Sequence, residues 1–178
     1  LYHLAQHGPD ALPWTGVAAI RGHAGVAALP TARTAVFVGH RFDPRGGDDG
    51  TPLRRTPWGE IAWQLAGEPG YALMAATDSA GSAPGGDTLG RLFDLVDEPG
   101  LILMDEVINY ISRHRADGLG GQLYNFVHSL TEEATARSNV VVAVSIPKSV
   151  EEMTADDEGD YQRFSKLLNR LGQAVVLS

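Results

Sequence analysis

The chain has 178 residues, of which 43% are hydrophobic and 20% charged, and its formal net charge is −8. This length and composition are those of one globular domain with its own core. The negative charge excludes an electrostatic footprint for nucleic acid, and the absence of cysteine excludes disulfides and thiolate metal sites. No apolar run could span a membrane and no signal peptide is visible, so we expect a cytoplasmic protein without a membrane partner.

Helical and extended patterns alternate along the first part of the chain. Residues 1–6 and 16–29 favour short helices, and the β-branched run 34–38 predicts a buried strand that ends at Gly39. Residues 41–56 are rich in glycine, proline and charge, which indicates a surface loop.

Thr56 marks the start of the next predicted helix. It has the residue type favoured at an N-cap, Pro57 follows at the first helical position, and an acid stands in the first turn. The helical pattern extends to residue 76, a Ser/Gly/Pro linker is predicted over 77–86, and another helix over 87–96.

The most informative pattern is Leu-Ile-Leu-Met-Asp-Glu at residues 101–106. A continuous apolar run is typical of a strand buried on both faces of a parallel sheet, and such sheets bind ligands at the carboxyl ends of their strands. In ATPases this pattern is the Walker B motif, whose Asp holds Mg²⁺ while the Glu orients or deprotonates the attacking water. Asp105 is therefore a candidate metal ligand and Glu106 a candidate catalytic base. The alternative is a strand that merely ends at an acidic turn.

A second buried strand is predicted over residues 139–145 and ends in a hydroxyl residue, Ser145. AAA-type ATPases carry their first sensor at the end of such a strand, which makes Ser145 a candidate catalytic residue, although a plain core strand would also end this way.

Helices are predicted over 106–114, 122–136 and 161–171, an acidic patch over 151–160, and a final strand over 174–177. Four strands that alternate with helices predict an α/β three-layer sandwich with a mainly parallel sheet. The six histidines show no metal-ligand spacing backed by acids.

With these motifs in this order, the chain resembles a family of prokaryotic AAA-like P-loop ATPases of the ASCE type whose function is unassigned. The matching parts are residues 55–62 (Arg-Thr-Pro-Trp-Gly-Glu-Ile-Ala), the Walker B run with Tyr110 downstream, and Ser-Ile-Pro at 145–147. The resemblance implies that residues 1–178 form a partial AAA-like ATPase domain. Arg55 is a candidate phosphate contact or arginine finger, although arginines beside loops are often only solvated.

The phosphate-binding loop of that family is missing from the sequence. No Gly-x-x-x-x-Gly-Lys-[Ser/Thr] occurs, and the chain opens with Leu-Tyr-His-Leu, which resembles the family's segment after the Walker A helix. We therefore expect a fragment that starts just after the Walker A motif and lacks the strand before it. ATP and Mg²⁺ are expected in the intact protein, and no cofactor on this fragment alone.

The resemblance also implies a strand order and a set of partners. The strands are expected in the order 34–39, 101–105, 139–145, with an exposed edge where the lost strand would pair. Segment 174–178 would close on that edge or be donated to another copy, so self-association is expected. For the full protein the family implies partners in DNA modification or phage defence. The alternative function is a non-catalytic α/β interaction or regulatory module.

Overall fold

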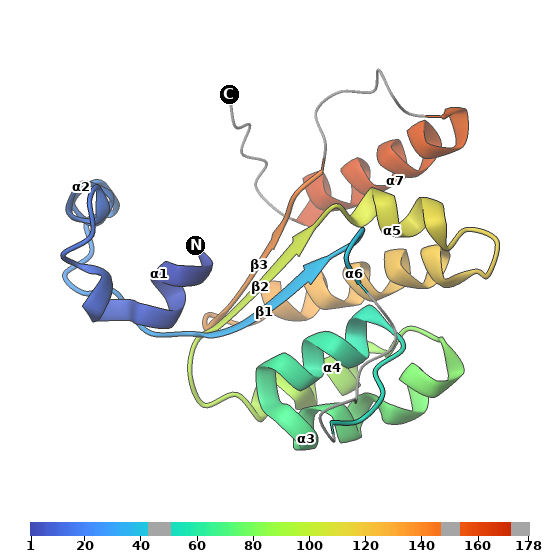
Figure 1. The fold of residues 1–178 in the computed structure, drawn as a ribbon, viewed down its shortest axis with the longest axis horizontal. Helices are drawn as coiled ribbons and strands as arrows, with labels where there is room; N and C mark the ends of the chain where they lie inside the picture. Colours follow the sequence, from blue (N-terminus) through green and yellow to red (C-terminus); the bar gives the residue numbers. More distant parts are fainter. Residues whose placement is uncertain (43–50, 147–153, 172–178) are drawn as a thin grey trace.

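The computed structural model describes residues 1–42, 51–146 and 154–171. Its centre is a parallel sheet of three strands in the order β1 (Arg33–Val38), β2 (Gly100–Asp105) and β3 (Val140–Val144), as Figure 1 shows. The expected α/β class, the parallel sheet and the order of these strands are thereby confirmed. The strand expected over 174–177 lies outside the described residues.

Helices surround the sheet in two groups and an N-terminal extension (Figure 1). Among the described elements, α3 packs on β1, α6 packs on β3, and α1 contacts both β1 and β2. None of the described helices is long and apolar enough to cross a membrane. The helices are α1 (Tyr2–His7), the 3₁₀ helix η1 (Gly8–Ala11), α2 (Val17–Ala24), α3 (Pro57–Ala80), α4 (Gly86–Asp94), α5 (Val107–Arg113), α6 (Leu119–Thr135) and α7 (Ala155–Leu171).

The two faces of the sheet differ in how well they are covered. On one face, Ala35 and Phe37 of β1 lie beside Ile102 and Met104 of β2, and all four are buried in the main core. On the other face, Leu101 and Leu103 are only half-buried, so the expectation that β2 is buried on both faces is only partly met. Helix α1 contacts this second face of β1 and β2 but leaves a pocket against it.

The start of α3 follows the local sequence signals. The Thr56 hydroxyl accepts a hydrogen bond from the Gly59 backbone N–H at 3.2 Å, as expected for an N-cap, and Pro57 follows at the first helical position. Trp58 is fully buried and its ring centroid lies 5.7 Å from that of Phe126 on α6. Trp58 therefore anchors the start of α3 in the core.

Several helix boundaries differ from the prediction. Helix α2 ends at Ala24 rather than at residue 29, and α6 begins at Leu119 rather than at residue 122. Helix α3 continues to Ala80 instead of ending at residue 76, and Gly81 then ends it in the left-handed conformation. Helix α7 begins at Ala155, so part of the predicted acidic patch is its first turn rather than a separate segment. The Thr154 hydroxyl accepts a hydrogen bond from the Asp157 backbone N–H at 3.2 Å, as an N-cap does. Acidic side chains in the first turn also interact favourably with the helix dipole.

Candidate functional site

The candidate site lies where the strands β2 and β3 end. Asp105 is the last residue of the central strand, and Ser145 directly follows the neighbouring strand. The Ser145 hydroxyl donates to Asp105 Oδ1, and the Ser145 backbone N–H donates to the Met104 carbonyl at 2.9 Å. Both side chains are exposed. The strand order β1, β2, β3 thus brings these two residues together at the carboxyl ends of adjacent strands.

Glu106 turns the chain sharply from β2 into α5. Its φ of 53° and ψ of 39° are left-handed, and among the described residues it is the only one other than glycine with a positive φ. Such a conformation costs about 1–2 kcal/mol. The Glu106 backbone N–H donates to Asp105 Oδ1 at 2.9 Å, so this turn and Ser145 engage the same carboxylate oxygen. Strained residues of this kind cluster at functional sites.

A third strand end completes the cluster, because β1 is followed by Gly39 and His40. His40 Nδ1 contacts Glu106 Oε2, and both side chains are partly exposed. The Gly39 backbone N–H donates to the Asp105 carbonyl at 2.8 Å. A Cβ on Gly39 would overlap the Glu106 carbonyl oxygen, so this close approach requires glycine. We call Gly39, His40, Asp105, Glu106 and Ser145 the strand-end cluster.

His40 was missed by the sequence analysis, which considered histidines only as metal ligands. The available signal was its position directly after a predicted strand of a parallel sheet, whose carboxyl end shares an edge with Asp105.

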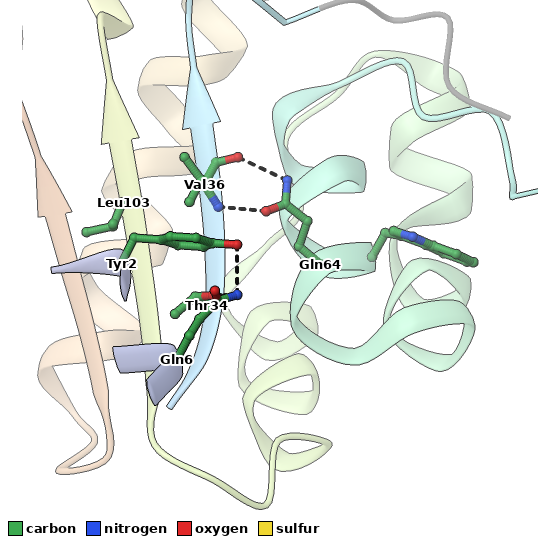
Figure 2. Close-up of a pocket in the computed structure, with 7 residues that line it drawn as sticks. Tyr2, Gln6, Thr34, Val36, Gln64 and Leu103 are labelled. Atoms are coloured by element: carbon green, nitrogen blue, oxygen red, sulfur yellow. Dashed lines mark hydrogen bonds between the residues drawn. The ribbon is translucent and has the colours of Figure 1, made fainter. Parts of the chain in front are cut away.

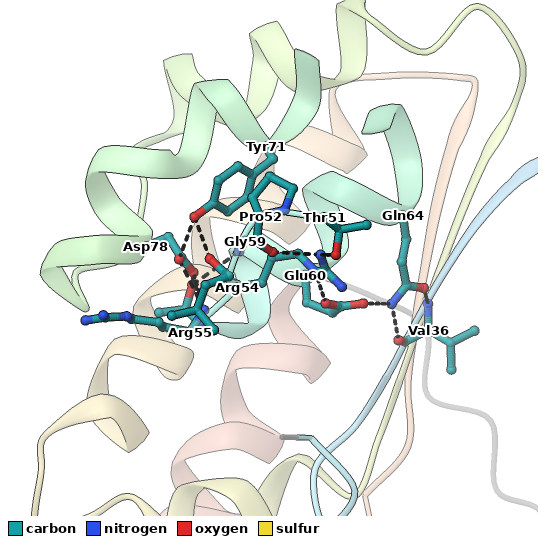
Figure 3. A network of polar contacts seen from close by, with 12 residues as sticks. Val36, Thr51, Pro52, Arg54, Arg55, Gly59, Glu60, Gln64, Tyr71 and Asp78 are labelled. Carbon is teal, nitrogen blue, oxygen red and sulfur yellow. Dashed lines mark hydrogen bonds and ion pairs between the residues drawn. The ribbon is translucent and has the colours of Figure 1, made fainter. Parts of the chain in front are cut away.

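Arg55 is not brought to this cluster. Its backbone N–H donates to both carboxylate oxygens of Asp78, at 3.0 and 3.1 Å, while its side chain is exposed and points away from that carboxylate (Figure 3). Among the described residues no polar contact joins Arg55 to Asp105, Glu106 or Ser145.

Asp78 instead holds the loop before α3 in place. Its buried carboxylate also accepts from the Thr56 backbone N–H and hydroxyl and from the Tyr71 hydroxyl (Figure 3). Burial and the nearby Asp78 charge raise the pKa of Tyr71, so the phenol stays protonated and remains a donor.

Arg54, the other arginine of this loop, has a structural task. Its Nε donates to Glu60 Oε2 at 2.5 Å, and Glu60 Oε1 accepts from the Gln64 amide at 2.8 Å. Gln64 in turn pairs with both the N–H and the carbonyl of Val36, at 2.7 and 3.0 Å, on the outer edge of β1 (Figures 2 and 3). This chain of contacts commits Arg54 to fixing α3 against the sheet.

A pocket of about 740 Å³ lies elsewhere, between α1, β1 and α3 (Figure 2). It contains no charged side chain and no residue of the strand-end cluster, and its polar groups pair with one another, as Gln6 does with the Tyr2 hydroxyl at 2.7 Å. Such a lining offers no carboxylate or imidazole, whereas the strand-end cluster offers both. The lining residues are Tyr2, Gln6, Thr34, Val36, Trp63, Gln64 and Leu103.

Tyr110 belongs to the core. It is fully buried among Phe37, Phe42 and His114, and its hydroxyl has no hydrogen-bond partner among the residues that the structure describes. Burial, together with the nearby Asp117 charge, raises its pKa, so it remains a neutral phenol. The structure therefore gives Tyr110 a packing role.

The strand-end cluster can hold a metal ion only when a phosphate ligand binds the same ion. Among the described residues, no group of three His, Asp or Glu side chains could hold a metal by itself. Mg²⁺, however, is commonly bound by one or two carboxylates together with water and substrate phosphates. Asp105 fits that arrangement, because the two hydrogen bonds that described residues donate to it both go to Oδ1 and its side chain is exposed.

An open parallel sheet with carboxylate and hydroxyl groups at adjacent strand ends defines the class: an α/β protein whose candidate ligand site lies at the carboxyl edge of the sheet. The chain belongs to the family of the DUF499 N-terminal domain, whose model matches residues 32–177. No curated protein and no solved structure matches the chain.

Proposed function

We propose that residues 1–178 form the Walker B and sensor part of an AAA-like ATPase domain that couples Mg-ATP hydrolysis to work on a partner. The observation that carries this proposal is the contact between Ser145 and Asp105 at adjacent strand ends, with Glu106 next in the chain. A strand that simply ended at an acidic turn would not require a second polar strand end against its carboxylate.

Four residues of the cluster have distinct roles in this proposal. Asp105 would hold Mg²⁺, directly or through water, and this ion would neutralise charge on the phosphate oxygens. Glu106 accepts a proton from the attacking water, and its contact with His40 orients the carboxylate. Ser145 responds to the bound ligand through its hydrogen bond to Asp105. Arg55 remains a candidate only for contacts outside this cluster, such as a phosphate on a neighbouring molecule.

The proposal requires groups that these residues do not supply. The 178-residue sequence has no Gly-x-x-x-x-Gly-Lys-[Ser/Thr], so the backbone cradle and the lysine for the β- and γ-phosphates must come from outside it. The net charge of −8 likewise means that any work in DNA modification or phage defence relies on other parts of the protein for contact with DNA. The second candidate, a non-catalytic interaction or regulatory module, needs neither of these.

Substitution of Glu106 by Gln in the intact protein separates the two candidates. Glu106→Gln removes the base but leaves Asp105 in place, so turnover should fall by about 100-fold or more while ATP binding is retained. Glu98→Gln is the matched control, because this exposed residue lies near the opposite end of β2. Steady-state hydrolysis and equilibrium nucleotide binding are measured for both variants. Undiminished hydrolysis by Glu106→Gln would reject the catalytic role, and no hydrolysis by the wild type would favour the regulatory module.

A further inference from the structure

Both ring nitrogens of His40 contact charged side chains. Nδ1 contacts Glu106 Oε2, and Nε2 lies 3.2 Å from Nε of Arg41, the next residue in the chain. The backbone around this histidine is held on two sides. The Arg41 N–H donates to the Val38 carbonyl at 3.0 Å, and Arg113 Nη1 donates to the His40 carbonyl at 3.1 Å. The ring is therefore presented to Glu106 from a fixed turn.

The Arg41 contact decides which nitrogen of His40 carries the proton. A guanidinium has only N–H donors, so Nε2 of His40 must be the acceptor in this contact. A neutral imidazole carries a single proton, which therefore lies on Nδ1. His40 then donates this N–H to the Glu106 carboxylate. If the proton were on Nε2, the Nδ1 lone pair would face the carboxylate and repel it.

We propose that Arg41 is a positioning residue for Glu106, acting through the tautomer of His40. Glu106 needs such support, because its side chain is 38% exposed and its backbone lies in a strained turn. Arg41 strengthens the preference for the Nδ1–H form that the Glu106 carboxylate itself exerts on the ring, and this form orients the carboxylate. The consequence for turnover rests on the proposed ATPase function, whereas the consequence for the tautomer does not.

The tautomer is tested by long-range ¹H–¹⁵N correlation spectra of the histidine-labelled protein at neutral pH. The His40 signals are assigned by their loss in His40→Ala. In the wild type we expect His40 to carry its proton on Nδ1. In Arg41→Ala the Nε2–H form should appear, and Arg41→Lys should restore the wild-type pattern because an ammonium also donates to Nε2. Arg33→Ala, an exposed arginine at the opposite end of β1, is the matched control and should change nothing.

Turnover of the intact protein supplies the second measurement. Arg41→Ala should lower kcat by about tenfold with nucleotide affinity unchanged, and Arg41→Lys should recover most of the loss. An unchanged His40 tautomer in Arg41→Ala, or an Nε2–H form in the wild type, would overturn the role of Arg41. A wild type without ATP hydrolysis but with the expected tautomer changes would overturn the ATPase proposal and leave the assignment of Arg41 intact.

Discussion

At the scale of single residues, the geometry of the strand ends depends on one glycine. Gly39 lies between the end of β1 and His40, and its Cα faces the strained turn at Glu106. A Cβ added there would overlap the Glu106 carbonyl oxygen and lie 2.9 Å from its carbonyl carbon and 3.2 Å from Tyr110 Cβ. Backbone atoms of a turn cannot move aside as a flexible side chain would. The residue type at position 39 therefore determines whether the two turns can approach this closely.

We therefore expect Gly39→Ala to destabilise the protein by about 1–3 kcal/mol, the usual cost of forcing extra volume into a packed region. Gly121→Ala is the control, because a Cβ at this helical position meets nothing within 4 Å and should be neutral or slightly stabilising. Urea unfolding of both variants measures the difference. A Gly39→Ala protein as stable as the wild type would show that this close approach is not needed.

At the scale of secondary structure, α7 is tied to the connection between α5 and α6 by one arginine. Arg115 Nη2 contacts Asp157 Oδ1 at 2.8 Å and Asp160 Oδ2 at 2.7 Å. The hydrogen bond from Arg115, with a second from Thr154, holds the pKa of Asp157 well below its usual range. Ion pairs thus fix the first turn of α7. Hydrophobic periodicity alone does not predict that the helix begins there.

The pH dependence of stability follows from this shift. Because the pKa of Asp157 is lower in the folded than in the unfolded state, its stabilising contribution is present above the unfolded pKa of about 4 and is lost as the pH falls below it. In Asp157→Asn the decrease of unfolding free energy below about pH 5 should be shallower than in the wild type. Urea unfolding at a series of pH values measures these slopes. Asp156→Asn, an exposed neighbour, should keep the wild-type slope, and equal slopes in all three proteins would contradict the prediction.

At the scale of the whole molecule, the two edges of the described sheet differ in what covers them. The outer edge of β1 is covered by the Gln64 amide, which occupies the Val36 N–H and carbonyl. Strand β3 forms the other edge of the described sheet, and Val141 on it is 58% exposed. Among the described residues no strand pairs with the outer edge of β3. Unpaired apolar edges tend to pair with other chains, so we propose that the β3 edge mediates self-association.

Sedimentation velocity over a range of concentrations tests this proposal. We expect the mass of the wild type to rise with concentration, and Val141→Lys to weaken association by about tenfold, because a lysine on an edge strand opposes pairing. Ile20→Lys is the matched control, since Ile20 on α2 is 55% exposed and lies away from the sheet. A wild type that stays monomeric at every concentration would remove the basis for the self-association proposal.

The sequence predicted those strands and helix ends whose signals lie within a few neighbouring residues. The apolar runs specified all three described strands, and Thr56 with Pro57 specified the start of α3. Parallel order then brought Asp105 and Ser145 to one edge, because parallel strands end on the same side of a sheet. The end of α3 and the start of α7 were misplaced, because Ser/Gly and acidic stretches are compatible with both loops and helix ends.

The sequence by itself determined the α/β class, the strands and the carboxylate–hydroxyl pair at their ends, since periodicity and caps act over a few neighbouring residues. Only the tertiary structure decided that His40 contacts Glu106, from 66 residues away, and that Arg55 faces elsewhere. Those outcomes depend on how β1 packs against β2 and α3 against β1, and on a glycine small enough to let two turns touch. Contacts of this kind are set by the shapes of distant segments, which no local pattern of residues encodes.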